Sequence, residues 1–402
     1  MRVLFTTLGS PSHGRAQLPL ARALAAAGHE VLVATTPEIA SVFGKDDVRV
    51  TPAMGEFHLH TFITPQVLEQ AGRRGPDGEV TREVMERILP LAMAGPMAGK
   101  LRECLLPVAR EFRPGLILRD GADLASCLIS EELGVPQLPT PSGSTNLIDP
   151  AEVLPGLNGL RAELGLPVLG DPLSIVPHGR IDCVPAAFSF ARHLPPSWSY
   201  RQSVAVDRGS VLPRWIADLP TDRPLVLAAL GTALPMLREA AAGGDAMHLP
   251  MPDSVRTLRS MITAASRLEE CTVIVSTSGI PVEADGLPRH VHVTDRVPQP
   301  LLLESVDLFL THGGFNSIRE ALRTATPMAV IPQFGDQLGN ACRVQELGLG
   351  REVTDRTPEG IATAVREVLA DPAVGARARA ARLAMLALPE IDRAVTDLEG
   401  LL

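Results

Sequence analysis

A pair of glycines stands where a short apolar segment would pass directly into a helix. Residues 306–311 are apolar and β-prone, which favours a strand covered on both faces. Gly313 and Gly314 allow the backbone to turn sharply and to come close to a ligand. His312, at the end of the strand, adds a hydrogen-bond donor or a cation at the same point.

The helix expected after these glycines supplies further groups for an anion. Asn316 and Ser317 are expected to open it, and Glu320 is expected in its first turn. A helix N-terminus attracts phosphate because its first N–H groups are unpaired and the helix dipole is positive there. The junction therefore predicts an anion-binding site, with an ordinary glycine-rich turn and helix cap as the alternative.

A second candidate for chemistry is His13, in the loop expected after the first strand at residues 2–8. A histidine with a near-neutral pKa can take a proton from a hydroxyl group at physiological pH. It needs a carboxylate that orients its ring, and Asp120 and Asp123 both follow the expected strand at 116–118. Asp123 could instead cap the helix that comes next. A loop histidine bonded only to backbone is the alternative for His13.

The composition limits the classes of protein. The chain has 402 residues, which favours two domains, and its 45% hydrophobic and 21% charged residues are ordinary for a globular protein in water. No stretch approaches the roughly 20 apolar residues of a membrane span. Residues 1–9 lack the long apolar region of a signal peptide, so we interpret them as the first strand of a cytoplasmic protein. The net charge of −9 argues against a nucleic-acid partner.

Neither the cysteines nor the carboxylates predict a metal site. The five cysteines are isolated and lack zinc spacing, and their odd number argues against a disulfide framework. We expect buried thiols in a reducing cytosol. The pair Asp46 and Asp47 has no third ligand nearby, and no segment has the oxygen-ligand density that Mg²⁺ requires. No metal or other cofactor is expected.

Strand and helix patterns alternate along most of the chain, which predicts an α/β fold with parallel sheets. The interrupted patterns of residues 52–113 and 139–200 suggest excursions from the sheet, and 207–222 is the expected linker. Two doubly wound domains facing one another would have a cleft at the carboxyl ends of both sheets. Strands are expected at 2–8, 29–35, 116–118, 135–138, 225–232, 272–276, 290–293, 306–311 and 327–331, and helices at 15–27, 123–133, 340–347, 373–388 and 390–401.

The motifs of the chain resemble those of a known family. The stretch THGGFNSIREALRTATPMAVIPQFGDQLGNA at 311–341 is similar to the nucleotide-sugar-binding signature of the GT-B fold, family 1 glycosyltransferases. Within that family it resembles the actinomycete enzymes that glycosylate macrolides, enediynes and other natural products. SHGRAQLPLARALAAAGHEVLVATT near the N-terminus and RVPQPLLL at 296–303 agree with the same family. The resemblance implies a GT-B fold of two facing Rossmann-like domains with an interdomain cleft.

The resemblance also implies a division of labour between domains. Residues 1–206 would form an acceptor-binding domain and 223–372 a nucleotide-sugar-binding domain, joined by 207–222. The helices from 373 to 402 would pack back on the N-terminal domain.

The site residues implied by the resemblance belong to two sets. In the first, His13 is the base and Asp120 its carboxylate partner, with Asp123 as the runner-up. In the second, the donor diphosphate is bound by His312, Gly313, Gly314, Asn316, Ser317, Gly231 and Thr232, the nucleoside by Arg296, Val297, Gln299 and Glu320, and the sugar by Asp336 and Gln337. Glu320 could instead complement the helix dipole, and Asp336 and Gln337 could form only a polar turn.

Two positions depart from the family's pattern. Ala325 stands where the family usually has glycine before a Thr-Pro pair, and alanine resists a positive φ. Arg296 replaces the tryptophan that plant relatives stack on the base, although a guanidinium can also lie flat on a ring.

Together with these residues, the resemblance implies an inverting, metal-independent glycosyltransferase. Its donor would be a dTDP- or UDP-sugar, with a deoxysugar favoured, and its acceptor a hydroxyl of a hydrophobic aglycone. The Met- and Leu-rich segment 52–110 suits such a pocket, with ordinary core packing as the alternative. The rivals are a sugar-nucleotide epimerase of the same fold and a non-catalytic nucleotide-binding homologue that activates a partner enzyme. The oligomeric state, a homodimer included, stays open.

Overall fold

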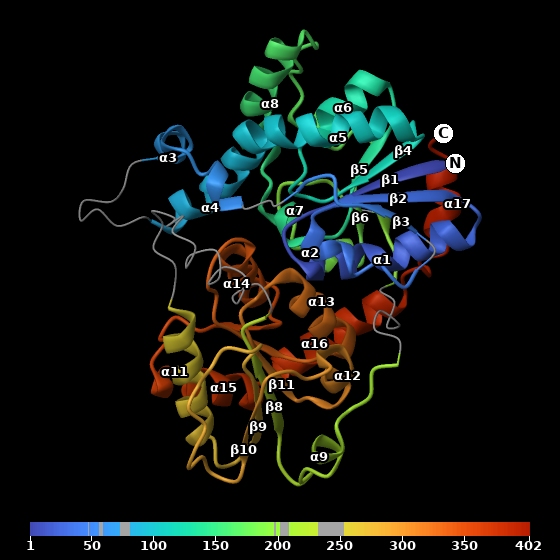
Figure 1. Cartoon of the computed structure of the whole chain (residues 1–402). Coiled ribbons are helices and arrows are strands. Elements are labelled where there is room, and N and C mark those ends of the chain that lie inside the picture. Colours follow the sequence, from blue (N-terminus) through green and yellow to red (C-terminus); the bar gives the residue numbers. More distant parts are fainter. Residues whose placement is uncertain (47, 56–58, 73–80, 197, 202–208, 232–252) are drawn as a thin grey trace. The chain divides into compact units, whose positions relative to one another are not determined.

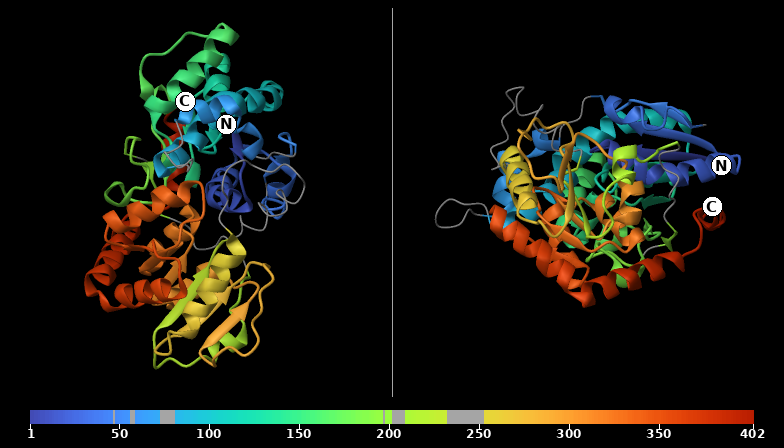
Figure 2. Two further views of the ribbon diagram at one scale, coloured as in Figure 1. Left: turned by 90° about the vertical axis from the view of Figure 1, so that its left-hand side faces the viewer. Right: turned by 90° about the horizontal axis from the view of Figure 1, so that it is seen from below.

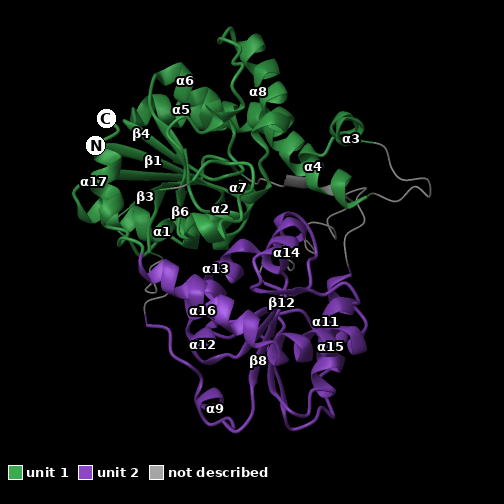
Figure 3. Cartoon of the chain, turned by 180° about the vertical axis from the view of Figure 1, so that it is seen from behind, with its two compact units in different colours: residues 1–206, 388–402 green, residues 207–387 purple. Residues whose placement is uncertain are grey.

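The computed structural model describes the chain except residues 47, 56–58, 73–80, 197, 202–208 and 232–252. The chain divides into two compact units, which Figure 3 distinguishes by colour. Unit 1 comprises Met1–Val206 and Leu388–Leu402, and unit 2 comprises Asp207–Ala387. The expected linker, 207–222, is thus counted with unit 2, and the last two helices of the chain belong to different units.

Unit 1 is built on a five-stranded parallel sheet with the order β3-β2-β1-β4-β5 (Figure 1). The inner strands read as continuous apolar runs because both faces of the sheet are covered by helices. A separate parallel pair, β6 and β7, lies outside this sheet. The strands of unit 1 are β1 (Arg2–Thr7), β2 (Glu30–Thr35), β3 (Arg49–Thr51), β4 (Leu116–Arg119), β5 (Gln137–Pro139), β6 (Ile181–Asp182) and β7 (Trp198–Ser199).

Alternate residues of β1 enter two different cores. Leu4 packs with helices α5 and α6 on one face, whereas Val3 and Phe5 pack with α1 and the C-terminal helix α17 on the other. The two chain termini accordingly lie on the same side of unit 1 (Figures 1 and 2). The helices of unit 1 are α1 (Pro11–Ala26), α2 (Pro37–Ala40), α3 (Pro65–Ala71), α4 (Arg82–Ala92), α5 (Ala98–Phe112), α6 (Ala125–Leu133), α7 (Gly143–Leu147), α8 (Pro150–Leu164) and α17 (Arg393–Glu399), with short helices η1 (Leu59–Phe62), η2 (Met93–Met97), η3 (Pro172–Ile175) and η4 (Ala186–Phe188).

Unit 2 repeats the design with six parallel strands in the order β10-β9-β8-β11-β12-β13. Helices α11 and α15 cover one face, where Val226, Val273 and Val275 are buried against them. The strands of unit 2 are β8 (Leu225–Ala229), β9 (Thr272–Ser276), β10 (Val291–Thr294), β11 (Leu308–Thr311), β12 (Met328–Val330) and β13 (Gly350–Glu352). The helices are α9 (Arg214–Ala217), α11 (Ser254–Ser266), α12 (Gln299–Leu302), η5 (Leu303–Ser305), α13 (Phe315–Thr324), α14 (Asp336–Glu346), α15 (Pro358–Ala370) and α16 (Pro372–Leu386).

The two segments without a clear pattern contain substantial helices. The segment 52–113 holds α3, α4 and α5, and α5 packs on the sheet of unit 1. The segment 139–200 holds α8. An internal proline and two glycines interrupt the helical pattern of apolar residues in α8, so the sequence did not predict this helix. Met54, Met93 and Met97 are buried in the core of unit 1. These three methionines therefore fit ordinary core packing, the alternative to an acceptor pocket in the segment 52–110.

The strand orders place one switch point in each sheet. In unit 1 it lies between β1 and β4, and in unit 2 between β8 and β11, because the sheet continues in opposite directions from each of these pairs. In open α/β sheets, ligands bind beyond the carboxyl ends of the strands at such a point. We therefore expect a ligand-binding site among the residues that follow β1, β4, β8 and β11.

Candidate functional site

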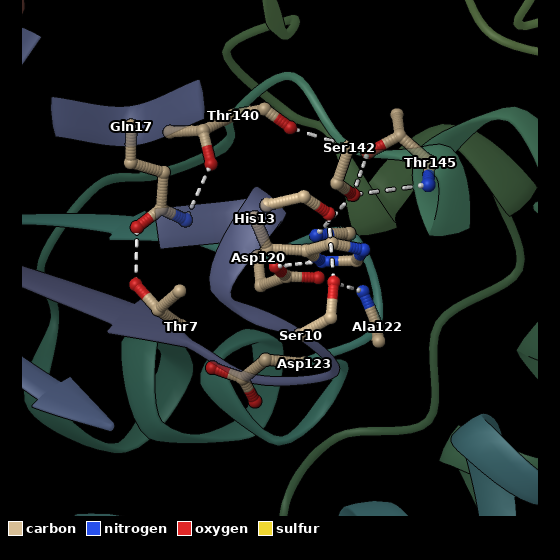
Figure 4. A network of polar contacts seen from close by, with 12 residues as sticks. Thr7, Ser10, His13, Gln17, Asp120, Ala122, Asp123, Thr140, Ser142 and Thr145 are labelled. Atoms are coloured by element: carbon tan, nitrogen blue, oxygen red, sulfur yellow. Dashed lines mark hydrogen bonds and ion pairs between the residues drawn. The ribbon is translucent and has the colours of Figure 1, made fainter. Parts of the chain in front are cut away.

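The switch point of unit 1 brings His13 and Asp120 into direct contact. His13 Nδ1 lies 2.7 Å from Asp120 Oδ2, and Figure 4 shows the two side chains together beyond β1 and β4. The Asp120 side chain is fully buried, whereas 17% of the His13 side chain is exposed. The other oxygen of Asp120, Oδ1, accepts from the Ala122 N–H at 2.9 Å. An ionised carboxylate only accepts hydrogen bonds, so in this pair Nδ1 is the donor and Asp120 the acceptor.

His13 is held in place by the helix rather than by a loop. The expectation of a loop was wrong, since α1 begins at Pro11 and His13 lies in its first turn. Proline at the first position has no N–H to leave unpaired and its φ already suits a helix. The His13 N–H donates to the Ser10 carbonyl at 2.9 Å. Gly9 lies beside the ring with φ +93, and a Cβ there would lie 3.2 Å from His13 Cε1.

Asp123 has a different set of partners. It accepts from the Thr6 hydroxyl at 2.6 Å and from both the N–H and the hydroxyl of Ser126, in the first turn of α6. Burial raises the pKa of the Asp123 carboxyl, and its hydrogen bonds oppose that shift. Asp123 therefore satisfies an N–H group in the first turn of α6, whose N-cap position is Leu124, while Asp120 is the carboxylate bonded to His13.

A buried polar network lies beside this pair (Figure 4). Gln17, which is 1% exposed, accepts from the Thr7 hydroxyl and donates to Thr140 Oγ1 at 2.8 Å. Ser142 Oγ accepts from the Gly121 N–H at 3.2 Å. These bonds tie α1, β1 and the segment after β5 together at the edge where His13 lies. The sequence reasoning missed them, because a lone glutamine or threonine carries no motif.

The switch point of unit 2 holds His312. It follows β11, Gly231 follows the neighbouring β8, and the imidazole is so close to both Gly231 and Gly314 that a Cβ at either position would clash with it. His312 is 7% exposed. Burial lowers the pKa of His312 to about 4, opposed by a hydrogen bond with the Ala229 backbone. At neutral pH the ring is therefore uncharged. Of the two predicted roles of His312, hydrogen-bond donor or cation, the structure favours the donor.

The glycines after His312 form the expected tight junction. Gly313 has φ +83, and a Cβ on it would lie 2.6 Å from Val330 Cγ1. Gly314 is the N-cap residue, and α13 starts at Phe315. Glu320 lies in the second turn of α13, so the prediction of a first-turn position was wrong, and with it the reason to assign Glu320 to the helix dipole.

Three predicted ligand residues of unit 2 meet on one side of α13. Gln299 Nε2 donates to Glu320 Oε2 at 2.8 Å and to Ser317 Oγ at 3.3 Å. The Gln299 N–H donates to the Val297 carbonyl at 2.8 Å, so these two backbone groups are bonded to one another. Arg296, which follows β10, is exposed.

The last two predicted residues lie in a helix. Asp336 and Gln337 are in the first turn of α14, which begins four residues before the expected helix at 340–347. Asp336 Oδ2 accepts from the Phe315 N–H at 3.3 Å and from Asn340 Nδ2 at 2.8 Å. Gln337 is 2% exposed, and its Oε1 accepts from the N–H of Gln333 at 2.9 Å. Asp336 thus borders the N-terminus of α13, whereas the side-chain carbonyl of Gln337 is bonded to a backbone N–H group.

Two predicted ligand residues remain, Thr232 and Asn316, and a third residue of this region, Asn340, was not predicted. Thr232 lies outside the described residues. Asn340, which is 2% exposed, donates to the Gly313 carbonyl at 2.9 Å and so braces the glycine turn. Asn316 Oδ1 accepts from Arg319 Nε at 2.6 Å.

Within the described residues, no three or more His, Cys, Asp and Glu side chains are grouped as a metal would require. None of the five cysteines forms a disulfide, and burial raises the pKa of Cys127 and Cys271. No helix within the described ranges is long and apolar enough to span a membrane.

Comparison with known proteins gives full-length similarity. Residues 259–401 match the family described as erythromycin biosynthesis protein CIII-like, C-terminal domain. The NDP-glycosyltransferase YjiC of Bacillus subtilis is 26% identical over 413 residues, which cover 97% of this chain and 95% of the relative. The 10-deoxymethynolide desosaminyltransferase of Streptomyces venezuelae is 25% identical over 439 residues, covering 100% and 97%.

Solved structures share the fold. The spinosyn rhamnosyltransferase SpnG, solved with thymidine diphosphate, aligns with a TM-score of 0.74 at 21% identity, covering 99% of this chain and 100% of SpnG. The same enzyme has been solved with the spinosyn aglycone. The chain therefore has the GT-B fold and is similar along its length to actinomycete natural-product glycosyltransferases, and its residues 259–401 match the erythromycin biosynthesis protein CIII-like C-terminal domain.

Proposed function

We propose that this protein is an inverting glycosyltransferase in which His13 deprotonates a hydroxyl of the acceptor. The hydrogen bond between His13 Nδ1 and Asp120 Oδ2, 2.7 Å long, carries the proposal. The hydroxyl proton moves to Nε2, and the imidazolium that forms is stabilised by the buried Asp120. The acceptor oxygen bonds to the anomeric carbon from the face opposite the leaving group. The bond from that carbon to the diphosphate breaks, and the diphosphate leaves with the electron pair.

The donor is proposed to bind unit 2 through its nucleoside diphosphate. The N-terminus of α13 and the neutral His312 would stabilise the charge that grows on the leaving diphosphate. No metal is needed for this charge in the proposed reaction. Glu320, held by Gln299, would accept from ribose hydroxyls, and the Val297 backbone would read the base edge. Asp336 would accept from sugar hydroxyls, and Gln337 would do so in place of its bonds to the N–H groups of Gln333 and Phe334.

We propose a dTDP-sugar, with a deoxysugar favoured over the UDP alternative, and a hydrophobic natural-product aglycone. Two observations on relatives support this choice. SpnG, named a rhamnosyltransferase, has been solved with thymidine diphosphate and with its aglycone. The Streptomyces venezuelae relative is named for transfer of desosamine to 10-deoxymethynolide.

The proposal is tested with His13→Ala. Turnover should fall roughly 10²- to 10⁴-fold, the usual contribution of a general base. The thermal shift that dTDP produces should stay the same, because the residues proposed to bind the donor belong to unit 2. His178→Ala changes an exposed histidine of the same unit and should leave both quantities unaltered. Loss of dTDP binding with normal turnover of the bound complex would contradict the role of His13.

The two rival functions give different products. An epimerase would isomerise a nucleotide sugar in the absence of any acceptor, which chromatography of the donor alone detects. If the protein is a non-catalytic activator, its partner enzyme should keep full activity in the presence of the His13→Ala variant. A thermal-shift panel of dTDP- and UDP-sugars, run beforehand, identifies the donor used in all these assays.

A further inference from the structure

The last residue of β4, Arg119, is a buried cation next to Asp120. Its side chain is only 2% exposed, although arginine is rarely buried so deeply. Removing a guanidinium from water is unfavourable unless its N–H groups are satisfied by the protein. The partners of Arg119 therefore indicate what this buried charge does.

The guanidinium bonds to the turn that carries Asp120. Nη1 lies 3.3 Å from the carbonyl oxygen of Asp120, 3.4 Å from that of Gly121 and 3.4 Å from that of Asp123. One N–H₂ group thus contacts three of the carbonyl oxygens in the turn at residues 120–123. Because the carbonyls of a turn can rotate only with its backbone, these contacts restrict the orientation of residue 120.

The remaining N–H groups anchor the guanidinium itself. Nε donates to Gln137 Oε1 at 2.8 Å, and Nη2 donates to the Ile175 carbonyl at 3.0 Å. Gln137, on the neighbouring strand β5, also donates to the Ile175 carbonyl at 2.8 Å. Arg119 is therefore fixed on one side to β5 and η3, and on the other side it holds the turn.

Another buried arginine of unit 1 shows a different arrangement. Arg161, which is 0% exposed, forms a bidentate pair with the Glu131 carboxylate at 2.7 and 2.9 Å and donates to Asn158 at 2.9 Å. Its contacts join α8 to α6. The hydrogen-bond acceptors of Arg119 are instead neutral oxygens, three of them in the Asp120 turn.

We infer that Arg119 is a positioning residue for the reaction, which fixes the turn so that the Asp120 carboxylate meets His13 Nδ1. This inference rests on the proposed function. The planar fork of the guanidinium reaches acceptors on opposite sides at once, which the single ammonium of lysine does not. The effect passes through the backbone of the turn to Asp120, and from Asp120 to the ring that takes the proton.

The experiment compares Arg119→Lys with Arg161→Lys in the full chain. Both substitutions disturb a buried guanidinium of unit 1 and should lower the unfolding midpoint. Arg119→Lys should lower kcat by about 10²-fold, the effect expected of a small misplacement of catalytic groups. It should leave KM for the donor unchanged, since the donor residues lie in unit 2. Arg161→Lys should keep both constants near those of the wild type.

A second measurement reads the geometry without turnover. The proton between His13 and Asp120 should give a downfield NMR signal that disappears in His13→Ala. Arg119→Lys should move or broaden this signal, and Arg161→Lys should not. A wild-type kcat together with an unmoved signal in Arg119→Lys would overturn the inference. If His13→Ala is inactive in that case, the proposed function survives; if His13→Ala retains full turnover, the proposed function fails separately.

A milder variant covers the case in which Arg119→Lys does not fold. Gln137→Met keeps the guanidinium and removes the acceptor of its Nε group. It should shift the same proton signal and reduce kcat in the same direction, by less than the lysine variant. An unchanged signal and unchanged kcat in a folded Gln137→Met protein would count against the positioning role.

Discussion

Asp120 and Asp123 are three residues apart in one buried turn, yet their carboxylates have separate partners. Asp120 Oδ2 lies 2.7 Å from His13 Nδ1, whereas Asp123 Oδ2 accepts from Thr6 Oγ1 at 2.6 Å. Figure 4 shows the Asp123 carboxylate away from the His13 ring. One carboxylate is therefore available to orient the histidine, and the other stabilises the start of α6.

This separation predicts that the two substitutions affect different properties. Asp120→Asn should reduce kcat roughly 10²- to 10⁴-fold with a small change in stability, because an amide N–H₂ facing Nδ1 favours the wrong tautomer. Asp123→Ala should keep kcat and lower the free energy of unfolding by roughly 1–3 kcal/mol, since it leaves the Thr6 and Ser126 groups unpaired. Steady-state kinetics and urea unfolding of both variants check this. A large loss of kcat in Asp123→Ala alone would reverse the assignment.

Much of this arrangement could be predicted from the sequence. The apolar runs that become β1, β4, β8 and β11 mark buried parallel strands, and the residues after them form the candidate site. The His-Gly-Gly sequence predicted the tight turn into a helix that the structure has at Gly313 and Gly314, because glycine allows that turn, and the helix start there is where we propose that an anion binds.

The rest depended on contacts between distant residues. Arg119 looks like the polar end of a strand, and only the fold shows that Gln137 and Ile175 surround it. The early start of α14 places Asp336 in a helix, and its bond to the Phe315 N–H joins residues 21 positions apart. Sequence patterns of helix and strand carry no information on such pairs.

The buried His312 predicts a loss of stability in acid. The pKa of His312 is lowered to about 4 in the folded chain from 6.5, so between these values the unfolded chain binds the proton and the folded chain does not. The free energy of unfolding should therefore be fully retained above pH 6.5 and decrease as the pH falls toward 4, by on the order of 3 kcal/mol.

Urea unfolding at pH 7 and pH 5 measures this decrease, with His312→Gln as the control. The glutamine variant loses the titrating group, so its pH dependence should be flatter than that of the wild type. Other groups titrate equally in both proteins and cancel in the comparison. Parallel pH profiles for the two proteins would show that His312 is not buried in its neutral form.

Ala325 predicts a stabilising substitution. It ends α13 with φ 59 and ψ 33, in the left-handed region, and the Thr326 N–H donates to the Ala321 carbonyl at 2.9 Å. This is the helix ending for which glycine is preferred. Ala325→Gly should raise the free energy of unfolding by up to about 1 kcal/mol, after the greater freedom of glycine in the unfolded chain is subtracted.

The control for Ala325→Gly is the same exchange inside a helix. Ala380 is exposed in the middle of α16, and Ala380→Gly should lower the free energy of unfolding by about 1 kcal/mol. Opposite signs in urea unfolding are the expected outcome. Equal losses at both positions would mean that Ala325 is not in the left-handed conformation in solution.

Gly313 and Gly348 separate backbone strain from loss of the donor site. Both have positive φ, +83 and +67, so alanine at either position is strained. A Cβ on Gly313 would also lie 2.6 Å from Val330 Cγ1, whereas one on Gly348 would lie 3.6 Å from Arg377 Cγ. Gly313→Ala must therefore shift the turn that leads into α13, and Gly348→Ala need not. We expect both variants to unfold at a lower temperature, and only Gly313→Ala to lose the thermal shift produced by dTDP. Calorimetry of dTDP binding to the folded proteins decides the matter, because normal affinity in Gly313→Ala would remove this turn from the donor site.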